Sequence, residues 1–146
     1  MSIESVEPPP DLASLVDRVL EDHAALRRHL GEAARLAQAQ GVGLLLDAIE
    51  ELAGELHDHM LKEERVLLPW IRAGRGATAG APIRAMATEH EHTLAIVARI
   101  RELAAGYRAP TDALAPLYLR LDGLDRLLHS HIALENDVLF PQALRS

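Results

Sequence analysis

The sequence contains no cysteine, very few aromatic residues (one Trp, two Tyr and one Phe) and no long apolar run. Without cysteine the chain can form no disulfide, no thiol nucleophile and no cysteine-ligated zinc or iron–sulfur site. Any metal must therefore be held by nitrogen and oxygen ligands. No signal peptide and no apolar stretch of about eighteen residues can be recognised, so we expect a cytoplasmic protein with no membrane partner.

Positive charge is also scarce. The chain has 15 Lys and Arg residues against 22 Asp and Glu residues, which gives a formal net charge of −7. The basic residues are scattered along the sequence and form no stripe that would follow a phosphate backbone. We therefore expect no nucleic-acid partner.

No segment shows the two-residue alternation of a half-buried strand, and the frequent Ala, Leu, Arg and Glu residues favour helices. The sequence predicts an all-α protein with a disordered N-terminal tail at residues 1–10, which ends in three prolines, and one domain at residues 11–146. Glycine and proline clusters divide this domain into four expected helices with short links, typical of an up-down-up-down four-helix bundle. The expected helices are approximately 12–40, which starts after an Asp11 N-cap and stops at Gly41, then 44–72, 82–105 and, from Thr111 or Asp112, 111–144.

Two segments have similar sequences: His57–Pro69 (HDHMLKEERVLLP) and His129–Pro141 (HSHIALENDVLFP). Within each segment a histidine stands four residues before a glutamate, as His59 before Glu63 and His131 before Glu135. On a helix this spacing places the two side chains on one face, about 40° apart, where they can chelate an ion. The duplication therefore predicts two such pairs in the bundle.

The glutamates and four histidines fall on the seams of the expected helices, where core positions step alternately by three and four residues. The predicted seams are Leu12, Val16, Val19, His23, Leu26, Leu30; Leu45, Ile49, Leu52, Leu56, His59, Glu63, Val66; Ile83, Met86, His90, Thr93, Val97, Ile100; and Leu117, Leu121, Leu124, Leu128, His131, Glu135, Val138. Counting from the turns at about 1.5 Å per residue brings all six polar residues to similar depth.

A single seam histidine is more often a hydrogen-bonded core residue than a ligand, but six polar groups in one narrow core change this balance. Burying two carboxylates and four imidazoles in this core would cost roughly several kcal/mol of folding free energy for each charge that has no partner. Two dications remove the difficulty, because iron, manganese and zinc accept these ligands. We expect two such ions, each with two histidines and a share of both glutamates, and open positions for an oxo group, water or a small diatomic ligand. The predicted metal ligands are His23, His59, Glu63, His90, His131 and Glu135.

The remaining histidines lie off the seams, and we expect them to face solvent or neighbouring helices: His29, His57, His92 and His129. A role around the metal or in its uptake stays open for them. Glu64 is turned about 100° from the seam, so we expect a solvated side chain.

On these residues the sequence resembles the hemerythrin-like, or HHE cation-binding, domain family over about residues 15–144. Within that family it is most similar to the di-iron domain of the repair-of-iron-centres (iron–sulfur cluster repair) proteins, in lines such as HMLKEE, MATEHE and HIALENDVLFP. The resemblance implies the same six ligands and two iron ions with an oxo or hydroxo bridge, and manganese or zinc stay open as alternatives because they accept the same ligands. Oxygen-carrying hemerythrins are less similar, because their third helix supplies two histidines four residues apart, whereas Leu94 follows His90 at that spacing. The repair proteins also carry a small cysteine-bearing domain that this sequence does not contain.

The resemblance implies a cytoplasmic non-haem di-iron protein of the nitrosative and oxidative stress response. Such a protein would donate iron to damaged iron–sulfur proteins or handle nitric oxide or oxygen. Three alternatives stay open: a sensor or store of oxygen, nitric oxide or iron without turnover, an oxidoreductase that removes peroxide or nitric oxide, and a helical scaffold without metal. Whether the protein is an enzyme is therefore not decided by the sequence.

Overall fold

The computed structural model describes residues 11–146, so the predicted tail at residues 1–10 lies outside the described residues. Within the described part of the chain all regular structure is helical, which confirms the predicted all-α class. Its main elements are α1 (Leu12–Gln40); α2 (Gly43–Lys62), the π-helical turn η1 (Glu63–Leu67) and α3 (Leu68–Arg72); the short turn η2 (Gly76–Thr78); α4 (Gly80–Leu103); the short turn η3 (Ala105–Tyr107); and α5 (Ala115–Ala133), the π-helical turn η4 (Leu134–Leu139) and α6 (Phe140–Leu144). None of these helices is long and apolar enough to cross a bilayer.

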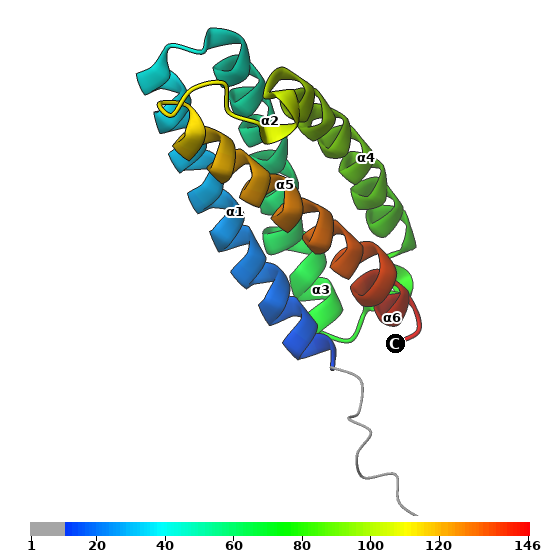
Figure 1. The fold of residues 1–146 in the computed structure, drawn as a ribbon. Helices are drawn as coiled ribbons and strands as arrows, with labels where there is room; N and C mark the ends of the chain where they lie inside the picture. Colours follow the sequence, from blue (N-terminus) through cyan, green and yellow to red (C-terminus); the bar gives the residue numbers. More distant parts are fainter. Residues whose placement is uncertain (1–10) are drawn as a thin grey trace, which may run out of the picture.

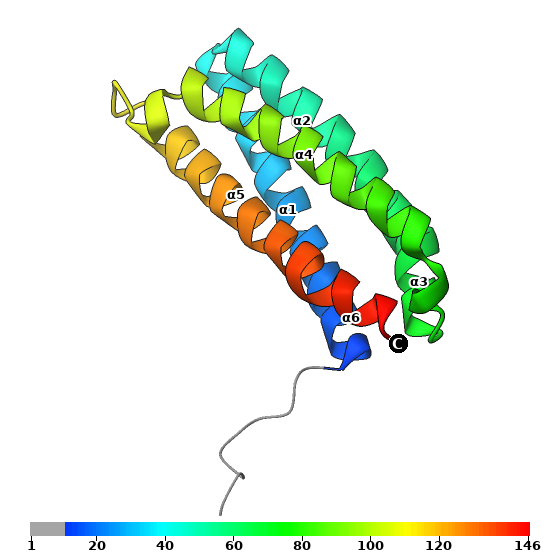
Figure 2. The same cartoon turned by 90° about the vertical axis from the view of Figure 1, so that its right-hand side faces the viewer.

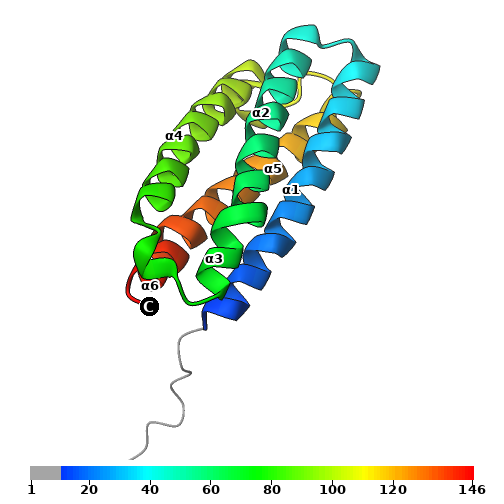
Figure 3. The same cartoon turned by 180° about the vertical axis from the view of Figure 1, so that it is seen from behind.

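The helices form four rods that run alternately up and down the molecule (Figure 1). The rod α1 lies against both α2 and α5, and α4 packs against α2 and α5 on the other side (Figures 2 and 3). The start of α1 and the end of α6 lie at the same end of the bundle. The predicted up-down-up-down four-helix bundle is therefore confirmed.

The ends of α1 follow directly from its sequence. Asp11 is the N-cap, and its carboxylate accepts a hydrogen bond of 2.7 Å from the backbone N–H of Ser14. Gly41 ends the helix in the left-handed conformation at φ 68°, which a residue without Cβ adopts at little cost. Both ends agree with the sequence-based expectation.

The fourth rod begins later than expected, at Ala115 instead of Thr111 or Asp112. The cause is Pro116, which occupies the first turn of α5. A helix that began at Asp112 would carry this proline in its interior, where the ring clashes with the carbonyl four residues earlier. Pro116 is the sequence feature that marks the start of this helix, and Thr111 and Asp112 lie before it.

The link between α4 and α5 is anchored by a buried carboxylate that the sequence analysis did not single out. Asp125 accepts a 2.6 Å hydrogen bond from the Tyr107 hydroxyl and bonds of 2.9 and 3.0 Å from the Arg101 guanidinium. Tyr107 and Ala105 both adopt positive φ angles, of 69° and 52°, which cost energy for residues with a Cβ. The hydrogen bond to Asp125 helps to hold this strained turn in place.

The apolar core is divided into two clusters. The turn-end cluster includes Leu26, Ile49 and Leu121, and the termini-end cluster includes Val19, Ile71 and Leu139. Along α1 the chain passes from Val19 in one cluster to Leu26 in the other, and His23 lies between them. The polar layer predicted from the seams therefore lies between the turn-end cluster and the termini-end cluster, which both exclude water.

The predicted seam is wrong where the two π-helical turns occur. Val66 and Val138 are 54% and 39% exposed, whereas the next residues, Leu67 and Leu139, are 2% and 0% exposed. A π-helical turn accommodates one extra residue, so the buried face moves by one position after it. The step of three that followed each glutamate in the seam pattern becomes a step of four.

Both π-helical turns precede a proline at the start of the next helix, Pro69 in α3 and Pro141 in α6. In a regular α-helix each proline ring would press on the carbonyl four residues earlier. The wider turn relieves this clash, and the N–H groups of Leu68 and Phe140 reach back five residues to the carbonyls of Glu63 and Glu135. Each proline is therefore accommodated by a local widening of the helix, and both rods continue.

The shift of the buried face can be tested by a pair of neighbouring substitutions. We expect Leu67→Ala to lower the free energy of unfolding by about 3 kcal/mol, because it opens a cavity in the core. Val66→Ala should change it by no more than about 0.5 kcal/mol, since the side chain is largely in solvent. Urea unfolding in the presence of a chelator measures both without a metal contribution, and equal losses would contradict the observed helical phase.

Candidate metal centre

All six predicted ligands come together in the layer between the two apolar clusters. They come from all four rods, and none is more than 3% exposed: His23 from α1, His59 from α2, Glu63 from η1, His90 from α4, His131 from α5 and Glu135 from η4. Each rod therefore contributes at least one inward-facing polar side chain to the same layer.

The six side chains form two groups, each able to surround one ion. The first group contains His23 and His131, and the second contains His59 and His90; both groups share Glu63 and Glu135. Within each group the potential ligand atoms lie within 4.8 Å of one another. The two groups therefore share both carboxylates.

The carboxylates lie between the imidazoles of the two groups. Glu63 places Oε1 at 3.0 Å from His23 Nε2 and Oε2 at 3.4 Å from His59 Nε2, so it directs one oxygen to each group. Glu135 Oε1 lies 2.8 Å from His90 Nε2 and 3.4 Å from His131 Nε2. Each glutamate thus contacts one histidine from either group, as a bridging ligand would.

Each of the four histidines forms a second hydrogen bond, through Nδ1, to a residue on a neighbouring rod. His23 pairs with Glu64 (2.7 Å), His59 with Glu89 (3.0 Å), His90 with Asn136 (2.9 Å) and His131 with Asp22 (2.9 Å). With Nδ1–H donating to these oxygens, every Nε2 lone pair is directed into the layer. The pairs therefore fix the tautomer in which all four imidazoles can bind a cation.

Sequence analysis did not identify these four partners, and for Glu64 the expectation of a solvated side chain is wrong. Glu64 is only 22% exposed and is held between His23 and Arg27. Each partner is adjacent in sequence to a predicted ligand, in the dipeptides Asp22-His23, Glu63-Glu64, Glu89-His90 and Glu135-Asn136. A neighbour turned by about 100° faces the next helix, so an acid or amide beside a seam ligand was a usable signal.

The other four histidines take no part in this layer. His57, His92 and His129 are exposed and His29 is half-buried. His129 forms a 2.9 Å contact with Asp125 on its own helix and does not belong to either ligand group. The expectation that these side chains face solvent or neighbouring helices is confirmed.

Several residues of this layer have strongly shifted pKa values. Burial and then the negative charge of Glu135 raise the pKa of Glu63, whereas the pKa of Glu135 lies well below its usual value because hydrogen bonds from its neighbours outweigh burial. Burial alone would lower the pKa of His59 and of His131. Hydrogen bonds and charges from the two glutamates reverse this and raise the pKa to about 10 for His59 and to about 9 for His131.

Several polar atoms in the layer have a surplus of lone pairs. Oε2 of Glu63 and Oε2 of Glu135 are buried without a hydrogen-bond partner among residues 11–146. Nε2 of His59 and Nε2 of His90 lie only 3.1 Å apart, and in the neutral tautomers set by Glu89 and Asn136 both nitrogens are acceptors, so without a cation one of them must carry a proton. Unpaired acceptors of this kind are costly in a dry interior, and a cation among them satisfies all of them at once. The donor set therefore fits a metal.

Comparison with known proteins supports this conclusion. The family model of the hemerythrin HHE cation binding domain matches residues 14–143. The chain is 37% identical over 146 residues to the iron-sulfur cluster repair protein DnrN of Neisseria gonorrhoeae, with 90% of each chain covered. It is 39% identical over 104 residues to the iron-sulfur cluster repair protein YtfE of Pectobacterium carotovorum subsp. carotovorum (strain PC1), covering 69% of this chain and 47% of that protein. The match to YtfE of Enterobacter sp. (strain 638) has 34% identity over 135 residues and covers 90% of this chain and 54% of that protein.

The chain thus spans nearly the full length of the Neisseria relative but about half the length of the YtfE relatives. The matched region includes every residue of the polar layer. Together the family match and the two histidine–glutamate groups indicate a metal site, for which iron is the typical occupant.

The raised histidine pKa values predict that metal binding expels protons. At pH 7 His59 and His131 hold their protons in the metal-free protein, because their pKa values of about 10 and 9 lie above the ambient pH. A cation must displace these protons, so affinity should rise about tenfold per pH unit for each proton released between pH 6 and 8. Anaerobic calorimetry with ferrous iron in buffers of different ionisation enthalpy counts the protons, and a pH-independent affinity would contradict the assignment.

Proposed function

The chain belongs to the hemerythrin HHE cation-binding domain family, and on that premise we propose that it binds two iron ions and supplies iron for the repair of damaged iron–sulfur clusters. One ion would be held by His23 and His131 and the other by His59 and His90. Glu63 and Glu135 would bridge the two, together with an oxo or hydroxo group after exposure to air. Two relatives whose alignments cover most of this chain, DnrN and the Enterobacter YtfE, are both named iron-sulfur cluster repair proteins, which supports the repair role. We place that role in the nitrosative and oxidative stress response.

The observation that carries the proposal is that two groups of ligand atoms share both buried carboxylates. A single-ion site would leave half of the imidazoles without a role and would not need a second glutamate. Neutral imidazoles and carboxylates are suitable ligands for iron, and also for manganese and zinc, whereas this layer offers no sulfur. The duplicated His-x-x-x-Glu line therefore accounts for two ions with one shared pair of bridges.

The protein's own residues hold and release the ions. The apolar clusters on either side of the layer keep bulk water away, which strengthens the electrostatic attraction between the carboxylates and a cation. The Nδ1 hydrogen bonds hold the imidazole rings in the binding orientation. Bound iron would supply one-electron redox chemistry and an open coordination position for nitric oxide or oxygen. Glu63 and Glu135 would hold the iron through their carboxylates, and a carboxylate that gives up one of its contacts would let an ion leave.

Substitution of the bridges tests the ligand assignment. We expect the parent chain to bind two ferrous ions, and Glu63→Ala or Glu135→Ala to lose most of the second ion because each removes a shared carboxylate. His57→Ala is the matched control, since His57 lies two residues from His59 but is exposed. Anaerobic reconstitution, colorimetric iron counting and a spectrum after exposure to air measure the occupancy. Equal iron loss in all three variants would contradict the assignment.

Iron transfer tests the repair function. The iron-loaded protein, mixed anaerobically with a cysteine-ligated apo-ferredoxin and a sulfide source, should restore the cluster absorbance. One control is the Glu135→Ala variant loaded with an equal amount of ferrous iron. The other is the parent protein with a chelator that traps any free iron. Failure to transfer iron would contradict repair, and steady turnover of peroxide or nitric oxide under reductant would instead assign the site to an oxidoreductase.

A further inference from the structure

The outer hydrogen bonds differ between the two groups, and we infer that the ion at His59 and His90 is held more weakly and leaves first, with Asn136 as the residue that sets this order. The inference rests on the proposed two-ion site and deepens it, because it states which half of the centre supplies iron. It follows from the partners of the four imidazoles and from the charges around those partners.

In the first group both imidazoles donate to carboxylates. His23 Nδ1 lies 2.7 Å from Glu64 and His131 Nδ1 lies 2.9 Å from Asp22. A carboxylate that accepts from Nδ1–H makes the opposite nitrogen a stronger electron donor. Both histidine ligands of this ion are therefore reinforced.

In the second group only one imidazole has a carboxylate partner. His59 Nδ1 lies 3.0 Å from Glu89, but His90 Nδ1 lies 2.9 Å from the amide oxygen of Asn136. The other side of the His90 ring stacks on Phe140, with ring planes 4° apart and centroids 6.1 Å apart. Outside the layer, His90 therefore has an orienting partner without a negative charge, and its ring packs against an apolar one.

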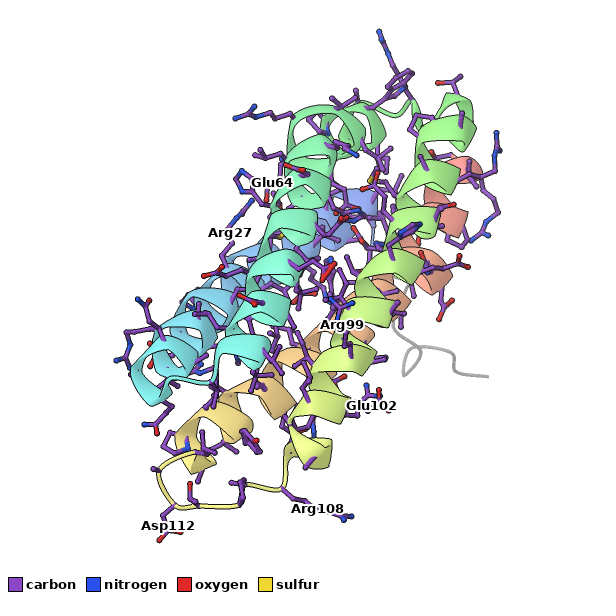
Figure 4. The ribbon with its side chains drawn as sticks, turned by 90° about the horizontal axis from the view of Figure 1, so that it is seen from above. Arg27, Glu64, Arg99, Glu102, Arg108 and Asp112 are labelled. Carbon is purple, nitrogen blue, oxygen red and sulfur yellow. The ribbon has the colours of Figure 1, made fainter. Side chains whose placement is uncertain are left out.

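The counter-charges leave this difference of one charge in place, because each group has one basic side chain. Glu64 forms two hydrogen bonds with Arg27, of 2.9 and 3.0 Å, at the outer edge of the bundle where α1 meets the α2 rod (Figure 4). Glu89 forms an ion pair of 2.6 Å with Lys62. Asp22 forms no ion pair with a lysine or arginine in the part of the chain that the structure describes.

These partners leave a different net charge beside each ion. Around His23 and His131, two carboxylates face one guanidinium, so one negative charge is uncompensated. Around His59 and His90, the carboxylate and the ammonium cancel and the amide adds no charge. A nearby negative charge attracts a dication directly, and removal of one outer hydrogen-bonding partner lowers metal affinity about 10- to 100-fold. Both effects favour the ion at His23 and His131.

The experiment measures iron release from the full chain after anaerobic loading with two ferrous ions per chain. An excess of a ferrous chelator is added and its absorbance is followed. We expect two phases of one iron each in the parent protein, with rates about 10- to 100-fold apart. Mössbauer spectra of a sample stopped after the first phase should retain one of two ferrous signals, which distinguishes loss of one particular ion from random loss.

Two isosteric substitutions should move the phases in opposite directions. Asn136→Asp gives His90 a carboxylate partner and should slow the fast phase toward the slow one. Asp22→Asn removes the carboxylate from His131 and should accelerate the slow phase, so that both ions leave together. Asp137→Asn is the control, because it changes one charge beside Asn136 on an exposed side chain and should leave both phases unchanged.

The outcomes separate this inference from the proposed function. If the parent protein binds two irons and releases them in a single phase, or if Asn136→Asp leaves the fast phase unchanged, the inference is overturned and the two-ion site stands. If fewer than two irons bind to the parent protein, the two-ion site itself is overturned and the inference falls with it. Unfolding curves of the metal-free variants that match the parent protein exclude a change in folding as the cause.

Discussion

The structure depends on the compensation of two glutamates that lie opposite each other, fully buried, in the middle of a four-helix bundle. Glu63 and Glu135 are 0% exposed, and four imidazoles approach them from the four rods. Without a metal, this layer relies on protons, which explains the raised pKa values of Glu63, His59 and His131. A metal cation would replace those protons as a stronger partner of the carboxylates. The apolar clusters on both sides supply folding free energy that such a layer cannot provide.

The four outer hydrogen bonds form a closed ring around the layer. Asp22 on α1 holds a histidine on α5, Glu64 on η1 holds one on α1, Glu89 on α4 holds one on α2, and Asn136 on η4 holds one on α4. Each adjacent pair of rods is therefore joined once at the level of the site. Because each bond joins two rods, the bundle's packing and the orientation of the imidazoles are set together, so a shift of one rod would misalign a ligand on its neighbour.

The fold and the six inner residues could be predicted because both depend on periodicity within a single helix. The alternating steps of three and four residues placed His23, His59, His90 and His131 on buried faces, and all four side chains are buried in the structure. The same rule failed at Val66 and Val138, because the one-residue phase shift arises from π-helical turns next to prolines, where a steric clash changes the helix itself. The outer partners depend on the register between helices, which the pattern of one helix does not contain.

The two repeated segments, His57–Pro69 and His129–Pro141, show why two similar ligand groups need not hold an ion equally. The two copies preserve the seam histidine, the seam glutamate and the proline, which define the inner ligands and the π-helical turn. They differ at the position after the glutamate, which is Glu64 in the first copy and Asn136 in the second, and each of these residues holds a histidine on the adjacent rod. The inner ligand set is therefore symmetric while the outer one is not. For the proposed two-ion site, a substitution at that single position would change the retention of one ion and leave both shared glutamates in place.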